Sequence, residues 1–202
     1  MKLNASNVNK VKFAKKFIAT ANVVKVSNGK EKPIPCSIYK LERGIDKDYF
    51  KTQPKYWKKA AFADSIEAEL LTKSSQSRPF GDIYTIEDSK GKMLGYCEQD
   101  ELYFQNVLAL VETSPAYKNA KKDRKIKYVG ETMLAFLVKM AKNQNKAAFA
   151  VDSVLDEARD FYSKKCGFEK DGIRTYILSE KQFDNFISQN ESHTQGKIEF
   201  MG

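Results

Sequence analysis

The stretch LYFQNVLALVE, residues 102–112, constrains the fold of this chain more than any other. Its apolar side chains continue without regular polar alternation, which predicts a strand buried on both faces. A strand of this kind lies inside a sheet that other elements cover. The neighbouring segments must therefore supply the rest of the sheet and its covering layers.

Three segments next to this strand extend the sheet. DIYTIED and MLGYCE flank SKGK and predict a β-hairpin with Gly91 in its turn. After the strand, apolar side chains between Met133 and Ala141 fall on one helical face. AAFAVD, residues 147–152, then predicts a short buried strand.

The C-terminal segments complete the pattern. A helix is predicted from Leu155 to Lys165 and ends at Gly167, and IRTYIL predicts the last strand. Ser179 and Gln182 have the spacing of a capping box that opens a final helix. The order predicts an α/β (α+β) fold, with a mixed, mostly antiparallel central sheet, a parallel crossover and flanking helices.

The N-terminal part shows other periodicities. Apolar residues at helical spacing predict a helix over residues 7–21. VVKVSNGKEKPIPCSIYKL predicts two extended segments around the turn formers SNG. Residues 46–73 again follow helical periodicity with an interruption near Pro54, and residues 74–79 predict a loop.

Cysteine and histidine content argue against several kinds of site. The three cysteines are widely separated and odd in number, which favours reduced thiols in a cytoplasm over a disulfide frame or a zinc site. A histidine-based mechanism or metal site would rest on His193 alone, so we expect no metal. No apolar run approaches the roughly 20 residues of a membrane span, so we expect no membrane partner. The N-terminus also lacks the apolar core of a signal peptide.

The net charge of +9 and the pI near 9.3 predict a surface that attracts anions. Nucleic acid, a phosphate-rich cofactor and an acidic protein all fit this charge. A solvated lysine-rich surface without a specific partner fits it as well. Charge alone favours none of these four interpretations.

The segment RKIKYVGETML, residues 124–134, places a basic loop directly before a helix. The first N–H groups of a helix lack intrahelical partners, and the helix dipole adds about half a positive charge there. Lys125 and Lys127 add full charges, and Gly130 allows a ligand to approach the backbone closely. This combination is suited to a pyrophosphate, although neither GxGxxG nor GxxxxGK[ST] is present. The alternative is a basic surface turn before an ordinary helix.

VDSVLDEARDFYSKKCGF, residues 151–168, contains Ala158, Phe161-Tyr162 and Gly167-Phe168. With the preceding loop KIKYVG, this stretch resembles the Gcn5-related N-acetyltransferase (GNAT) superfamily. The family patterns are Q/R-x-x-G-x-G/A for the loop and A-x-x-FY-x-x-x-GF for the later helix. The resemblance covers roughly residues 80–179 and implies a GNAT-like fold.

The resemblance implies three parts of the chain and a cofactor site. These are N-terminal helices and first strands that are either on the acceptor side or family-specific (1–78), an acetyl-CoA-binding core (79–188) and a polar C-terminal tail (189–202). Acetyl-CoA, as co-substrate, would lie in the split between the strand ending at Glu112 and AAFAVD. The implied cofactor-binding residues are Leu110, Val111, Lys125, Ile126, Lys127, Tyr128, Val129, Gly130 and Thr132.

Two residues are candidates for proton transfer. Glu112, at the end of the central strand, is the candidate general base, directly or through water. Its structural alternative is a strand-end carboxylate that caps a turn or pairs with a lysine. The resemblance assigns Tyr162 as the general acid toward the leaving thiolate of CoA. Its structural alternative is a partly buried tyrosine with a satisfied hydroxyl.

Two residues depart from the family pattern. Tyr128 stands where the first glycine is usual, so the turn has to avoid positive φ or accept strain. Glu131, in the first helical turn, suits the helix dipole but would repel a nearby phosphate unless it points away.

The resemblance implies an N-acetyltransferase that moves an acetyl group to a primary amine by direct attack on the thioester. The segment AVDSVLDEARDFYSKKCGF is also similar to the corresponding helix of bacterial toxins that acetylate aminoacyl-tRNA. The positive charge of the chain supports this alternative, because affinity for tRNA comes mainly from neutralising its phosphates. A non-catalytic nucleic-acid-binding or interaction module on a degenerate GNAT fold remains the alternative. The acceptor and the oligomeric state stay open, and a dimer is one option.

Overall fold

The computed structural model describes residues 14–55, 57, 81–102, 104–114, 126–152 and 154–201. Within them, one ten-stranded sheet has the order β10-β1-β2-β3-β4-β5-β7-β9-β8, with β6 paired to β1. The strands are β1 (Lys16–Ser27), β2 (Lys30–Leu41), β3 (Asp82–Asp88), β4 (Met93–Glu101), β5 (Gln105–Thr113), β6 (Ile126–Lys127), β7 (Ala148–Val151), β8 (Glu169–Lys170), β9 (Tyr176–Ser179) and β10 (Glu199–Phe200). Among the described strands, β5 and β7 form the single parallel pair, which confirms the predicted fold class.

Two tight turns set the register of the first four strands. Asn28 and Gly29 join β1 to β2 with φ of 51° and 71°, as a two-residue hairpin turn requires. Gly91, with φ of 73°, lies in the turn between β3 and β4. The predicted hairpin with Gly91 in its turn and the two predicted extended segments around SNG are therefore confirmed.

The predicted N-terminal helix is wrong where the structure can be compared with it. From Lys16 onward the chain is in β1, and Ala19, Ala21 and Val23 are buried in strand alternation. The helical spacing of the apolar residues did not determine the secondary structure of this segment, because β1 pairs with β2 along nearly its whole length. Residues 7–13 lie outside the described part of the chain.

The helical prediction for residues 46–73 is not followed over its first part. This part consists of turns and one short 3-10 helix, η1 (Phe50–Thr52). Of residues 56–80, the structure describes only Trp57. The rest of the predicted helix and the predicted loop at residues 74–79 therefore lie outside the described residues.

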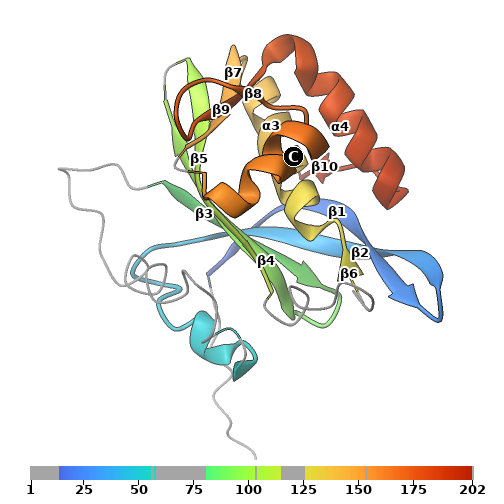
Figure 1. The fold of residues 1–202 in the computed structure, drawn as a ribbon. Helices are drawn as coiled ribbons and strands as arrows, with labels where there is room; N and C mark the ends of the chain where they lie inside the picture. The colour runs from blue at the N-terminus through green and yellow to red at the C-terminus, as the bar shows by residue number, and fades with distance from the viewer. Residues whose placement is uncertain are drawn as a thin grey trace, which may run out of the picture.

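The two long helices pack on one face of the sheet (Figure 1). α3 (Val129–Asn143) buries Met133 to Val138 against β1, β4 and β5. α4 (Glu180–Thr194) begins with the predicted capping box, in which the backbone N–H of Ser179 donates to Gln182 at 2.9 Å. The main hydrophobic core lies between these helices and the sheet.

A second, smaller core lies on the opposite face of the sheet, under the segment that contains η1 (Figure 1). Its buried members are Leu41, Tyr49, Phe50, Trp57, Ile83, Met93 and Tyr96, with Leu110 packed against them. Phe50 and Trp57 both contact the Tyr96 ring, at centroid distances of 5.3 and 5.5 Å. The sheet is thus covered on both faces at its centre.

The C-terminal end belongs to the sheet. α4 continues to Thr194, so the boundary expected between residues 188 and 189 falls inside this helix. Phe200 of β10 then pairs with Ala19 of β1, and Ile198 is buried. The segment expected to be a polar tail therefore contains the end of α4 and the edge strand β10.

Candidate active site

The sheet opens where β5 and β7 separate. Their parallel pairing ends at Leu108 and Val151. At the same point Ala109 is an extra residue in β5, because Glu98 and Gln99 of β4 pair with Leu110 and Leu108. A bulge of this kind bends a strand and re-aims its backbone groups. The rest of β5 therefore leaves β7, and a cleft opens between them.

The cleft holds a cavity of about 100 Å³. Residues 108–111 of β5 line one wall, and Val151 and Asp152 line the other. Ala158 and Tyr162, from the helical segment after β7, close it. Two predicted cofactor-binding residues, Leu110 and Val111, and one catalytic candidate, Tyr162, thus meet at one cavity.

Tyr162 lies in a π-helical turn, η4 (Phe161–Lys165), which follows the 3-10 turn η3 (Asp156–Ala158). The N–H of Cys166 donates to the Phe161 carbonyl at 3.0 Å, the i to i+5 bond of such a turn. Tyr162 is 6% exposed, and burial raises the pKa of its phenol. The hydroxyl is therefore protonated at neutral pH, as a proton donor must be.

The N-terminus of α3 has no side-chain cap. The first intrahelical bond runs from the Thr132 N–H to the Tyr128 carbonyl at 2.8 Å. The N–H groups of Val129, Gly130 and Glu131 therefore precede the first bonded turn and have no acceptor within the helix. A Cβ built on Gly130 would contact Thr113 Cγ2 at 3.5 Å and Phe161 Cζ at 3.9 Å. The helix thus begins between the end of β5 and the π-helical turn.

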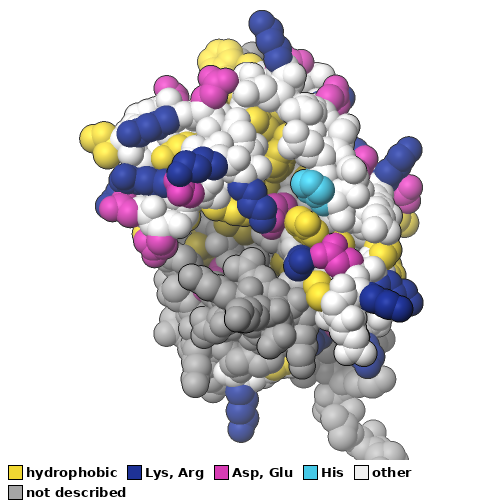
Figure 2. Space-filling model, turned by 45° about the vertical axis from the view of Figure 1, so that its right-hand side comes forward, with side chains coloured by type: hydrophobic (Ala, Val, Ile, Leu, Met, Phe, Trp, Pro, Cys, Tyr) yellow, Lys and Arg dark blue, Asp and Glu magenta, His cyan; other side chains and the backbone are white. Residues whose placement is uncertain are grey.

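Tyr128 accepts the strained conformation. It has φ of 68° and ψ of 13° at the N-cap of α3, in the left-handed region that costs a residue with a Cβ about 1–2 kcal/mol. Its ring stacks on His193 of α4, at a centroid distance of 5.3 Å and an interplanar angle of 18°. The ring thus packs against α4 while its carbonyl accepts the first helical bond. The only histidine of the chain lies at the surface (Figure 2).

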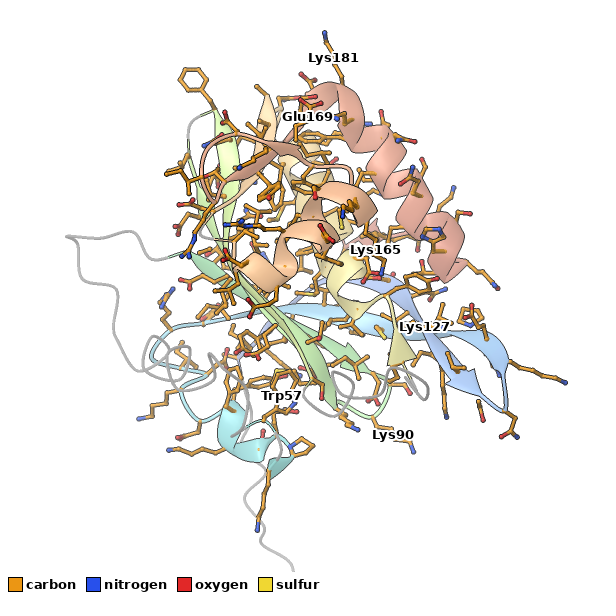
Figure 3. All side chains as sticks on the ribbon, viewed as in Figure 1. Trp57, Lys90, Lys127, Lys165, Glu169 and Lys181 are labelled. Atoms are coloured by element: carbon orange, nitrogen blue, oxygen red, sulfur yellow. The ribbon has the colours of Figure 1, made fainter. Side chains whose placement is uncertain are left out.

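Ion pairs set the charge around this helix start. Lys165, at the end of η4 (labelled in Figure 3), pairs with Glu131 and so offsets the acidic residue in the first turn of α3. Lys127 on β6 is 2.6 Å from Glu31 Oε1, and Ile126 packs against the main core. Lys125 lies outside the described residues.

Thr132 faces the interior of the protein. Its hydroxyl donates to the Asn22 carbonyl at 3.2 Å, and the Asn190 amide donates to the same hydroxyl at 3.4 Å. The residue is fully buried. The side chain is thus used to join α3 to β1 and α4, and only its place in the first helical turn relates it to the site.

Glu112 lies on the face of the sheet opposite α3. Val111 packs against the main core, whereas Leu110 packs against the smaller one. Glu112 is buried and accepts a hydrogen bond from the Tyr96 hydroxyl at 2.6 Å. Burial and this bond raise the pKa of the Tyr96 phenol. The structure therefore separates Glu112 from Tyr162, with the edge of β5 between them.

Three residues of the site were missed from the sequence: Tyr96, Asp152 and Lys165. Tyr96 is paired directly with Glu112 in the β4–β5 ladder, so the hairpin register would have indicated it. Asp152 ends the predicted strand AAFAVD, and its position at the cleft follows from the predicted split. Lys165 is 34 residues from Glu131, and no local pattern predicts their contact.

Within the described ranges, no group of three or more His, Cys, Asp or Glu side chains could hold a metal ion. The helices there are all too short or too polar to cross a membrane.

No protein-family model matches the chain, and no curated protein sequence matches it significantly. A dodecameric spermidine N-acetyltransferase from Vibrio cholerae matches in structure with a TM-score of 0.52 and 13% identity, over 74% of this chain and 96% of that chain. Mutant forms of the spermidine/spermine N-acetyltransferase SpeG from the same organism match with a TM-score of 0.51 and 14% identity, over 74% and 98%.

An acetyltransferase of the GNAT family from Staphylococcus aureus matches with a TM-score of 0.43 and 16% identity, over 72% of this chain and 99% of that chain. At such identities the matches with a TM-score above 0.5 establish the fold. The mixed sheet with one parallel pair and flanking helices is a GNAT-like α/β fold.

Proposed function

We propose that the protein is an acetyl-CoA-dependent N-acetyltransferase that moves an acetyl group to a primary amine. The observation that carries the proposal is the cleft between β5 and β7 beside an α3 N-terminus without a side-chain cap. The named N-acetyltransferases that share the fold support it. The free, buried cysteines fit a reducing compartment, and we assign the protein to the cytoplasm.

The cofactor would be held mainly by backbone groups. The N–H groups of residues 129–131 face an anion site in which the helix dipole favours negative charge. Residues 126–128 lead into this helix start. Lys127 is paired there with Glu31, and Lys125 in the preceding loop would add positive charge. The pairing of Glu131 with Lys165 reduces the repulsion of a phosphate there. Leu110 and Val111, which line the cleft, offer main-chain groups to the pantetheine arm.

Acetyl-CoA supplies the acetyl group as a thioester, and the protein positions it and moves protons. As the amine nitrogen bonds to the carbonyl carbon and the carbon–sulfur bond breaks, a main-chain N–H near Val111 or Glu112 stabilises the developing oxyanion. Glu112 accepts the amine proton, directly or through water. Tyr162, which is protonated and lines the cleft, gives its proton to the leaving thiolate.

Two variants at Gly130 test the phosphate site, because asparagine and aspartate differ in charge but hardly in size. The aspartate of Gly130→Asp suits the helix dipole, so the fold should be retained. It would, however, repel a pyrophosphate. In calorimetric titrations with acetyl-CoA we expect Gly130→Asn to keep measurable affinity and Gly130→Asp to bind at least about tenfold more weakly than it.

The wild type provides the reference. Saturable binding of acetyl-CoA that distinguishes the two variants supports the proposal. Absence of binding to the wild type would refute it. A salt-dependent affinity for tRNA without any acetyl-CoA effect would favour the nucleic-acid-binding alternative.

A further inference from the structure

The side chain of Lys15 occupies a closely fitted site on the face of the sheet that carries Glu112. Its ammonium lies 2.6 Å from both Oε1 and Oε2 of Glu87. The Glu87 side chain is only 2% exposed. Tyr49 donates its hydroxyl to Glu87 Oε1 at 2.6 Å, which fixes the carboxylate. A buried carboxylate is thus oriented with both oxygens toward one cation.

Aromatic rings complete the surroundings of this cation. The Lys15 Nζ atom is 4.0 Å from the centroid of the Tyr39 ring and 5.5 Å from that of Tyr49. Both distances are within the range of cation–π attraction. An oriented carboxylate with two aromatic rings is a combination that recognises an alkylammonium group. We call Glu87, Tyr49 and Tyr39 the ammonium box.

The Lys15 side chain reaches the ammonium box from the segment that precedes β1. Lys15 lies before the first residue of β1, so the strand ladder does not include it. Asp46 holds this segment, because its Oδ1 accepts from the Ala14 N–H at 2.9 Å and its Oδ2 from the Glu42 N–H at 2.8 Å. The Lys15 side chain is 22% exposed. The ammonium box is therefore partly open to solvent beside Lys15, and Asp46 holds the segment that carries this lysine.

The box lies on the same face of the sheet as Glu112, the proposed general base. Tyr39, Thr85, Tyr96 and Glu112 are direct partners across β2, β3, β4 and β5, so they share one face of the sheet. Glu87 is two residues after Thr85 on this face. Since neighbouring strands are about 4.8 Å apart, Thr85 and Glu112 are separated by roughly 10 Å.

We propose that the ammonium box binds an alkylammonium group of the acceptor, and that Lys15 occupies it as an internal competitor. An ammonium held by both oxygens of Glu87 has no free lone pair. The box therefore holds a second, charged group of the acceptor, while another amine of the same molecule reacts near Glu112. The acceptor role rests on the proposed function, whereas binding of an alkylammonium to the box does not.

The test uses Lys15→Ala, which vacates the box, and n-butylammonium chloride, which resembles the removed side chain. Calorimetry at constant ionic strength should show saturable binding to Lys15→Ala. We expect affinity about 10–100-fold above that of the double variant Lys15→Ala/Glu87→Gln, because the charged partner is lost in the latter. The wild type should bind the probe weakly, since Lys15 competes with it.

If Lys15→Ala does not fold, Lys15→Gln provides a second test, because its amide can still donate to Glu87. The probe must then bind this variant more tightly than the wild type. Equal, unsaturable binding to all variants would overturn the proposal and leave the ion pair as a structural contact.

Binding of the acceptor by the ammonium box is tested separately, by the KM of acceptors. Lys15→Ala should lower the KM of acceptors that carry a second cation and leave the KM of monoamines unchanged. Probe binding without any acetyl-CoA binding would retain the box and reject the proposed function. Acetyl-CoA binding without probe binding would retain the proposed function and reject the ammonium box.

Discussion

The two faces of the central sheet differ in the polar groups that they carry: hydrogen-bond donors on one face and carboxylates on the other. On the α3 face, the N–H groups at the helix start have no intrahelical acceptor, and the nearby acidic residue Glu131 is paired with Lys165. On the other face, Glu87 and Glu112 are buried, and each accepts a hydrogen bond of 2.6 Å from a tyrosine hydroxyl. One face thus presents donors and the other presents acceptors.

This difference teaches how one sheet can bring an anion and a cation together. The donors suit the phosphates of a cofactor, and the acceptors suit an amine and its proton. β5 separates the two sets, because Val111 packs toward α3 and Leu110 packs toward the opposite face. The cleft beside β5 is where the two ligands would meet.

Glu112→Gln should produce the largest effect and act on one face only. Glutamine can still accept the Tyr96 hydrogen bond but cannot take a proton from the amine. We expect kcat to fall by about 10²–10⁴-fold with acetyl-CoA affinity unchanged, measured by thiol release with a panel of primary amines and by titration. An unchanged kcat would mean that water takes the proton, and a loss of cofactor affinity would contradict the separation of the faces.

Lys165→Ala should weaken acetyl-CoA binding on the other face. The change leaves the Glu131 carboxylate without this partner beside the helix start, and we expect affinity to fall by about fivefold, more at low salt. The matched control is Lys165→Ala/Glu131→Gln, in which the unpaired charge is absent. Failure of the double variant to recover affinity would show that Lys165 acts in another way.

Two substitutions at Tyr128 should give the smallest effect. Both remove the ring stacked on His193, but glycine adopts positive φ freely and alanine does not. We expect Tyr128→Gly to be about 1 kcal/mol more stable than Tyr128→Ala in urea unfolding. Equal stabilities would mean that the backbone relaxes out of the left-handed region.

Local patterns predicted the parts of the fold that local chemistry determines. The capping box at Ser179 and the two hairpins follow from turn and cap residues, and the structure contains them. Helical spacing failed over residues 16–21, because pairing with β2 outweighed a weak periodicity.

The site could be predicted only in outline. The split beside β5 and the place of Tyr162 follow from the order of strands and the family resemblance. The contacts of Glu131 with Lys165, of Tyr128 with His193 and of Lys15 with Glu87 join residues far apart in the chain. Such contacts depend on packing and leave no local pattern.

The most direct test of the account is amide hydrogen exchange of the wild type with and without acetyl-CoA, resolved to single residues. The account predicts slower exchange at residues 129–131, where the N–H groups would donate to the pyrophosphate, and at residues 109–112 of β5. Residues 83–86 of β3 provide the internal control and should not change. Protection confined to other parts of the chain, or none at saturating acetyl-CoA, would contradict the account.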